Sequence, residues 1–193
     1  MSYTIDEITK ILKANRIGHT DSTINWLLTD SRSLSFPEDT LFFALYSLHG
    51  DGTKYIKDLY ARGVRNFVIA SSQGHKQNST LDLTFYTEAN FLVVDNTLKA
   101  LQRLTTHHRN QFKYPVVGIT GSNGKTIVKE WLYQLLSADR RVVRSPRSYN
   151  SQIGVPLSVW QMNEDADIAI LEAGISEPDE MGMLESIIKP TIG

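Results

Sequence analysis

The sequence predicts an α/β fold in two parts: a small α/β domain over residues 1–96, then the first part of a parallel-sheet domain over residues 97–193. Three observations support this prediction. Apolar runs of strand length alternate with amphipathic helical segments in the second half, which is typical of a parallel sheet. A complete set of strands and helices precedes Asn96. A glycine-bearing turn joins a strand to a helix near residue 120, as in a phosphate-binding loop.

The first part begins with a helix. Thr4 and Glu7 have the spacing of a capping box, and Ile5, Ile8 and Leu12 follow at helical spacing. Four apolar runs then predict strands at 24–28, 41–45, 67–70 and 91–94. The remaining expected elements are a tight loop at 48–52, a helix over 55–60 closed by Gly63, and a polar loop over 71–82.

The second part alternates more regularly. A helix marked by Leu98, Leu101 and Leu104 leads into it, and we place the domain boundary just before this helix, near Asn96. Expected strands lie at 116–120, 141–144 and 168–171, and expected helices at 125–136, 153–162 and 179–188. Pro156 is compatible with the first turn of its helix, and Pro190 closes the last one.

The composition excludes several classes of protein. The 193 residues are 41% hydrophobic, and 20 basic against 21 acidic side chains give a net charge of −1, which argues against a nucleic-acid partner. The absence of cysteine excludes disulfides, thiolate metal sites and a cysteine nucleophile. Without a secretory signal or an apolar run of membrane length, we expect a soluble, cytoplasmic protein with no membrane insertion.

Histidine and tryptophan residues give no sign of a cofactor. The five histidines lack metal-ligand spacing, so no zinc site is expected, and a helix end is sufficient to explain the pair His107–His108. Trp26, Trp131 and Trp160 fall at positions that suggest the core.

The most informative stretch is Val116–Thr126, which runs from a strand through Gly121, Ser122, Asn123 and Gly124 into a helix. Such a turn wraps backbone N–H groups around a triphosphate and directs a helix N-terminus at it, which predicts an ATP site. Lys125 is placed to reach the β- and γ-phosphates, and the Thr126 hydroxyl to bind Mg²⁺. Ile119 stands where the general phosphate-loop pattern has its first glycine.

Two further features surround this loop. Glu172 ends an expected strand, and in open parallel sheets ligands bind at the carboxyl ends of strands, so we expect it to hold Mg²⁺ opposite Thr126. Arg140, Arg141, Arg144 and Arg147 fall within eight residues. They form either a solvated rim or a positive wall for a phosphorylated substrate, and the sequence leaves both interpretations open.

At this point the sequence resembles the Mur ligase family. The resemblance covers essentially the whole chain, and the family's phosphate loop shares the Thr-Gly-Ser-Asn-Gly-Lys-Thr form without the extra glycine. The matching elements are Thr29-Asp30-Ser31-Arg32, Leu41 to Leu45, Asp51-Gly52, Gly118 to Thr126, Tyr149 to Leu157, Leu171 to Gly174 and Lys189 to Gly193.

The resemblance implies an ATP-dependent amide ligase of peptidoglycan precursor synthesis, with Lys125, Thr126 and Glu172 in catalytic roles and ATP and Mg²⁺ as cofactors. Asn150 to Leu157 look most like the subgroup that joins D-alanyl-D-alanine to UDP-N-acetylmuramoyl-tripeptide through an acyl phosphate. Residues 1–96 would bind the UDP end of that substrate, and residues 97–193 would bind ATP. The implied substrate contacts are Thr29, Ser31, Arg32, His49, Gly50 and Asp51, with Asn150 and Ser151 near the sugar-peptide.

The chain also departs from the family pattern. Ile127 replaces a frequent threonine, Ser151 a common asparagine and Asp179 a usual glycine. The family's histidine loop, modified lysine and C-terminal domain would follow Gly193, so we expect an N-terminal fragment that binds but does not catalyse alone, from an enzyme that in some relatives is fused to an alanine racemase.

Three alternatives to this reading of the function remain open. The chain could come from a Mur ligase that adds the third stem-peptide residue or from a folylpolyglutamate synthase-like ligase. It could also be a non-enzymatic UDP-sugar-binding module. The oligomeric state is not predicted.

Overall fold

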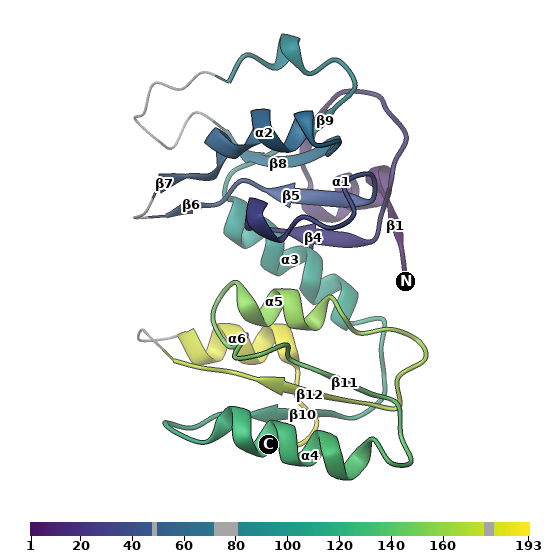
Figure 1. Cartoon of the computed structure of the whole chain (residues 1–193), viewed down its shortest axis with the longest axis vertical. Helices are drawn as coiled ribbons and strands as arrows, with labels where there is room; N and C mark the ends of the chain where they lie inside the picture. Colours follow the sequence, from purple (N-terminus) through teal and green to yellow (C-terminus); the bar gives the residue numbers. More distant parts are fainter. Residues whose placement is uncertain (48–49, 72–80, 176–179) are drawn as a thin grey trace. The chain divides into compact units, whose positions relative to one another are not determined.

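The computed structural model describes residues 1–47, 50–71, 81–175 and 180–193 (Figure 1). The chain forms two compact units, Met1–Leu101 and Gln102–Gly193. The division falls inside α3 (Thr97–Arg109) and not at the expected boundary near Asn96. Asn96 instead caps the N-terminus of this helix, because its Oδ1 accepts a hydrogen bond of 2.9 Å from the Lys99 backbone N–H.

A five-stranded sheet forms the centre of the first unit, in the order β2-β9-β8-β5-β4. Its strands β4, β5, β8 and β9 are parallel, and β2 runs antiparallel to β9. Three of these strands confirm the sequence prediction, whereas the short β2 was not expected. The bounds are β2 Asn15–Ile17, β4 Trp26–Leu28, β5 Thr40–Phe43, β8 Asn66–Ala70 and β9 Asn90–Val94.

The strand expected at 24–28 is broken in two, and that prediction was wrong. β3 (Thr23–Ile24) pairs with β1 (Tyr3–Thr4) in a separate antiparallel ribbon, and only β4 enters the main sheet. The break lies at Asn25, because the backbone N–H groups of Asn25 and Trp26 both donate to the carbonyl oxygen of Asp39, at 3.0 and 3.1 Å. An apolar run in the sequence does not reveal that two successive N–H groups bind the same carbonyl oxygen.

Helices cover this sheet through residues at the predicted spacing. α1 (Ile5–Leu12) starts at the Thr4 capping box and buries Ile5, Ile8 and Leu12. α2 (Ile56–Ala61) packs on the face that carries Phe42, Phe67 and Phe91, one from each of three neighbouring parallel strands. The other elements of this unit are β6 Tyr46–Ser47, β7 Gly50–Asp51 and the short 3₁₀ helices η1 Ser31–Ser33, η2 Gly52–Tyr55 and η3 Leu83–Phe85.

The second unit is a parallel three-stranded sheet with helices on both faces, as predicted. The strand order is β10-β12-β11, with α4 on one face and α5 and α6 on the other (Figure 1). α5 is shorter than the expected 153–162, and the start of the expected 179–188 helix lies partly outside the described residues. The bounds are β10 Val116–Ile119, β11 Val142–Arg144, β12 Ile168–Glu172, α4 Lys125–Leu136, α5 Gly154–Val159 and α6 Glu180–Ile188.

The last turn of α3 is buried in the second unit. The His108 ring packs against Phe112 and Trp160, and one ring nitrogen lies 2.9 Å from the carbonyl oxygen of Met162. Burial lowers the pKa of His108 to about 4. Arg109 donates to the carbonyl oxygens of Ile188 and Lys189, at 2.6 and 2.8 Å, and so fixes the end of α6. Packing in the core of this unit, and not the helix end alone, therefore accounts for a histidine at position 108.

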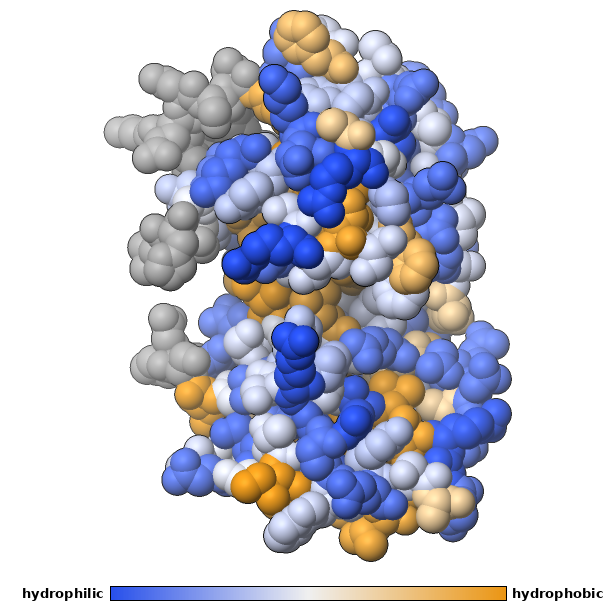
Figure 2. Space-filling model, in the orientation of Figure 1, coloured by the Kyte–Doolittle hydropathy of each residue, from blue (hydrophilic) through white to orange (hydrophobic). Residues whose placement is uncertain are grey.

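Two of the three tryptophans lie at the surface, contrary to the expectation. Trp26 is 48% exposed and stacks on Phe36, and Trp131 is 64% exposed, whereas Trp160 is buried. Trp131 lies on the outer face of α4, whose other exposed apolar residues are Ile127, Val128 and Leu135. Orange residues at the bottom of Figure 2 mark this region. Among the residues that the structure describes, no helix has the length and hydropathy of a membrane crossing.

Candidate functional site

The predicted phosphate loop occupies the turn between β10 and α4. Gly121 and Gly124 have φ angles of +135° and +81°, a backbone region that favours glycine. Gly124 also occupies the N-cap of α4, where a glycine provides no side chain to satisfy the first helical N–H groups. These N–H groups and the positive end of the helix dipole therefore remain available to an anion.

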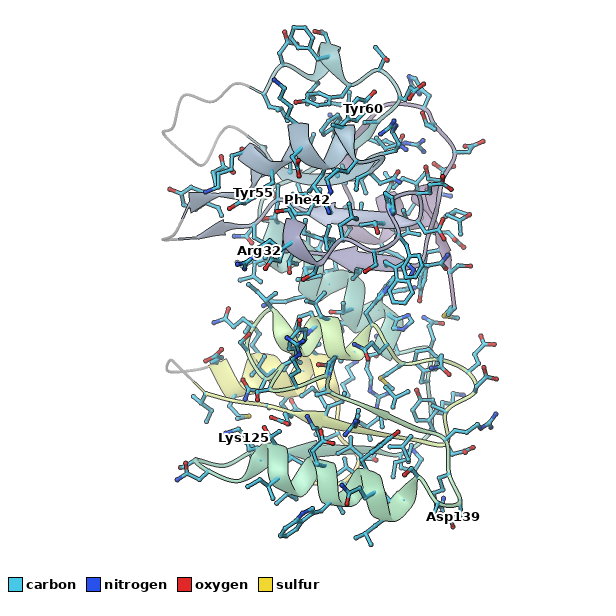
Figure 3. All side chains as sticks on the ribbon, in the orientation of Figure 1. Arg32, Phe42, Tyr55, Tyr60, Lys125 and Asp139 are labelled. Carbon is cyan, nitrogen blue, oxygen red and sulfur yellow. The ribbon has the colours of Figure 1, made fainter. Side chains whose placement is uncertain are left out.

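Lys125 begins α4 and folds back over the loop (Figure 3). Its Nζ donates to the carbonyl oxygen of Gly121 at 2.5 Å. The ammonium group thus lies above the turn that a phosphate would enter. A single carbonyl contact on an exposed loop is readily exchanged for a charge-assisted bond to phosphate.

Glu172 ends β12 next to Thr126, as the sequence predicted. The Thr126 hydroxyl donates to Glu172 Oε2 at 3.2 Å, and the carboxylate is fully buried. Adjacent oxygens of an octahedral Mg²⁺ site lie about 3 Å apart, because each stands about 2.1 Å from the metal. Within the described ranges, no group of three or more His, Asp or Glu is arranged to hold a metal ion. The donor set therefore fits a Mg²⁺ that takes its other ligands from phosphate and water.

Lys129 was missed by the sequence analysis. Its Nζ lies 2.9 Å from Glu172 Oε1, and both side chains have no exposed surface. The same ammonium donates to the carbonyl oxygens of Ser145, at 2.9 Å, and Arg147. The pair is not aligned as a hydrogen bond, since Glu172 Oε1 has no hydrogen-bond partner among the described residues. The available signal was spacing: Lys129 is four residues after Lys125 and continues its helix face.

The segment after β11 reaches the same edge of the sheet. Ser145 Oγ accepts a hydrogen bond of 3.0 Å from the Glu172 backbone N–H. Ser148 Oγ lies 3.4 Å from the Thr126 hydroxyl oxygen. These two serines, which the sequence analysis did not single out, attach the chain that follows β11 to the metal-ligand candidates.

Asn150 and Ser151 follow directly. The Asn150 carbonyl oxygen accepts from the Gly174 N–H at 2.8 Å, and a Cβ built on Gly174 would lie 3.0 Å from the Asn150 side chain. A larger residue at position 174 would therefore have to displace the Asn150 side chain. Ser151 Oγ accepts from the Gly154 N–H at 3.2 Å, which gives its hydroxyl a local role at the start of α5. The structure thus brings the predicted residues 121–126, 150–151 and 172 to one edge.

Two arginines of the cluster at 140–147 form ion pairs with different acidic residues. Arg141 binds Asp167 through its side chain, and Arg144 pairs with Glu130 and lies over the Tyr133 ring. The bond from Arg141 is the largest cause of the lowered pKa of Asp167. For Arg141, whose side chain is 66% exposed, the contacts support the solvated-rim interpretation.

In the first unit, Thr29–Ser33 follow the carboxyl end of β4. Asp30 caps η1 by accepting from the Arg32 backbone N–H at 3.0 Å, and the Arg32 guanidinium binds the same carboxylate with Nε at 2.9 Å and Nη2 at 2.6 Å. These hydrogen bonds are the main reason that the pKa of Asp30 is lowered and that of Arg32 raised. The Arg32 side chain is nevertheless 87% exposed, so it can also meet a ligand.

Gly50 and Asp51 follow the neighbouring strand, β5. They form β7 of a hairpin with β6, and Asp51 Oδ1 accepts from the Thr53 N–H at 2.9 Å. A Cβ on Gly52 would lie 2.8 Å from the Leu45 nitrogen, so this turn requires glycine. Figure 3 shows Arg32 and Tyr55 on the same side of this unit. His49, the remaining predicted contact, lies outside the described residues.

Comparisons with known proteins show what the chain is similar to. Residues 119–193 match the family described as the Mur ligase middle domain. UDP-N-acetylmuramoyl-tripeptide--D-alanyl-D-alanine ligases from Borreliella burgdorferi and Synechocystis are 33% and 35% identical over 91% and 90% of this chain. The chain spans only 38% and 36% of those relatives' lengths.

Solved structures share the fold of this chain. A crystal structure of MurF from Acinetobacter baumannii has a TM-score of 0.81 and 24% identity, and the match covers 98% of this chain and 40% of that protein. MurF ligase from Thermotoga maritima, solved in complex with ADP, has a TM-score of 0.67 and 26% identity, over 86% of this chain and 36% of that protein. With the phosphate loop, Glu172 and the segment after β11 at one edge of its sheet, the chain belongs to the Mur ligase family.

Proposed function

We propose that this chain is the UDP- and nucleotide-binding part of a ligase that joins D-alanyl-D-alanine to UDP-N-acetylmuramoyl-tripeptide at the expense of ATP, in the cytoplasm. The observation that carries the proposal is the pair of oxygens on Thr126 and Glu172, 3.2 Å apart beside an uncapped helix N-terminus. This pairing suits Mg²⁺-bound phosphate. The names of two curated relatives supply the two substrates.

The proposed reaction activates a carboxylate. The terminal carboxylate of the tripeptide attacks the γ-phosphorus of ATP, ADP leaves, and an acyl phosphate forms. The amine of D-alanyl-D-alanine then attacks the acyl carbon, loses a proton and expels phosphate. Lys125 would exchange the Gly121 carbonyl for the phosphates and balance their charge, while Thr126 and Glu172 would hold Mg²⁺, which when bound neutralises further phosphate charge.

The first unit would hold the UDP end of the substrate. Thr29, Ser31 and Arg32 follow the carboxyl end of β4, and Gly50 and Asp51 follow β5, its direct neighbour in the parallel sheet. Ligands of open parallel sheets bind at this edge. Hydroxyl and backbone groups can read a uracil edge, and the exposed Arg32 guanidinium suits a diphosphate. Asn150 and Ser151 would contact the sugar-peptide.

Calorimetric titration of the chain with UDP and with Mg-ADP, each separately, tests the proposal. We expect binding of both. A folylpolyglutamate synthase-like ligase would bind Mg-ADP but not UDP, and a UDP-sugar-binding module would bind UDP but not Mg-ADP. Phosphate release by the full-length protein that carries this chain then decides between Mur ligases: it should require the tripeptide substrate and D-alanyl-D-alanine together.

A further inference from the structure

Lys129 and Glu172 form a fully buried ion pair. Lys129 Nζ faces the Glu172 oxygen Oε1, whereas the Thr126 hydroxyl donates to the other oxygen, Oε2. The ammonium group is surrounded by oxygens: one carboxylate oxygen and the carbonyl oxygens of Ser145 and Arg147. Glu130 Oε1 adds a fourth contact at 3.3 Å.

We propose that Lys129 is a positioning residue for the metal-bound nucleotide: it holds Glu172 Oε1 so that Oε2 remains directed at Thr126 and the cation. The inference rests on the proposed function, since it assigns a support to the same metal site. In this proposal Lys129 contacts neither the phosphates nor the metal and acts only through Glu172.

The geometry explains why a lysine is needed at this position. A buried carboxylate without a counter-charge pays a large desolvation cost and can relieve it by turning away or becoming neutral. Lys129 is fixed on a helix and anchored by two backbone carbonyls, so its own position does not depend on Glu172. It therefore presents a rigid cation to one oxygen and leaves the other free for the metal.

The same ammonium connects the metal site to the segment that carries Asn150 and Ser151. Ser145 accepts from the Glu172 N–H through its hydroxyl and from Lys129 through its carbonyl oxygen, and Arg147 immediately precedes Ser148, whose hydroxyl lies near Thr126. Lys129 thus fixes the start of this segment and Glu172 as one unit.

The test measures how much Mg²⁺ strengthens ADP binding. Calorimetry on the whole chain gives the dissociation constant of ADP in EDTA and in MgCl₂, and the first divided by the second is the Mg²⁺ ratio. In Lys129→Met this ratio should fall about 10-fold or more, the range for residues that support a metal ligand, while affinity for metal-free ADP stays within about twofold. A purely structural role would weaken both affinities together. Lys113→Met, at an exposed lysine of the same unit, should leave both constants unchanged.

Because Lys129→Met leaves a buried carboxylate unpaired and can prevent folding, the comparison is repeated in the Glu172→Gln background. There Lys129→Met should change the Mg²⁺ ratio less than about twofold, because the carboxylate that it positions is already gone. A further 10-fold loss in that background would overturn the inference, as would an unchanged or higher ratio in Lys129→Met itself. A wild-type chain whose ADP affinity does not respond to Mg²⁺ would instead refute the proposed function, and the inference with it.

Discussion

Each unit has an ion pair at the carboxyl edge of its parallel sheet, and the two pairs differ in burial. Asp30 and Arg32 form theirs in a loop after β4, with side chains that are 43% and 87% exposed. Lys129 and Glu172 form theirs between α4 and the end of β12, with no exposed surface. Each pair includes one residue that the Mur ligase resemblance places at a ligand, Arg32 in the first and Glu172 in the second. The exposed pair can exchange partners with water, and the buried pair cannot.

The difference indicates two ways of holding a charged ligand. An exposed pair contributes little to stability, and its arginine can leave Asp30 for a diphosphate at small cost. A buried pair fixes its carboxylate before any ligand arrives, because separating the partners would leave a charge unsolvated. Substitutions at the second pair should therefore affect folding first, and those at the first pair should affect binding alone.

The largest effect is expected for Glu172→Ala. This change leaves the Lys129 ammonium buried without its counter-charge, and it should lower the free energy of unfolding by about 3–5 kcal/mol. Urea denaturation of the chain, followed by circular dichroism, measures the loss. Glu172→Ala/Lys129→Met, which removes both charges, should recover most of it, and a double variant as unstable as the single one would contradict this account of the pair.

Burial should also make the second unit sensitive to acid through His108. Its pKa is about 4 in the folded chain and about 6.5 when unfolded, so between these values the unfolded state binds the extra proton. Stability is therefore complete above pH 6.5 and falls as the pH drops toward 4, by roughly 3 kcal/mol. Urea midpoints at pH 7, 6, 5 and 4 measure the slope. His108→Gln should flatten it and His107→Gln, at an exposed neighbour, should not.

The sequence predicts features that depend on local patterns better than features that depend on contacts with distant residues. The phosphate loop, the placement of Glu172 after a strand and the alternation of the second unit were predictable, because each leaves a local pattern of spacing or periodicity. For Lys129 the only local signal is its spacing from Lys125, because its burial depends on carbonyl oxygens 16 and 18 residues away. The broken strand at Asn25 similarly depends on the Asp39 carbonyl oxygen, and the outward-facing Trp131 depends on which face of α4 meets the sheet.

An intermediate effect is expected for Lys125→Ala, one helical turn before Lys129. Its ammonium contacts only the Gly121 carbonyl oxygen in the described structure, so its loss should change the free energy of unfolding by less than about 0.5 kcal/mol. Mg-ADP affinity should fall about 10- to 100-fold, the value of a hydrogen bond to a charged group, and turnover by the full-length enzyme should be abolished. Near-normal turnover by a folded variant would disprove the phosphate-loop assignment.

The smallest effect is expected for Arg32→Ala. Two nitrogens of Arg32 bind Asp30 in a solvent-exposed loop, and such an exposed pair contributes little to stability, so the free energy of unfolding should be nearly unchanged. UDP affinity should fall about 5- to 10-fold, because one partly screened contact to the diphosphate is lost, while Mg-ADP affinity should not change. Calorimetry with each ligand, at low salt and at 0.5 M salt, measures both affinities. The loss of UDP affinity in Arg32→Ala should be smaller at high salt, because salt screens the wild-type contact. Equal losses for UDP and Mg-ADP would show that Arg32 supports the fold and does not contact the substrate, and the contrast between the two pairs would then fail.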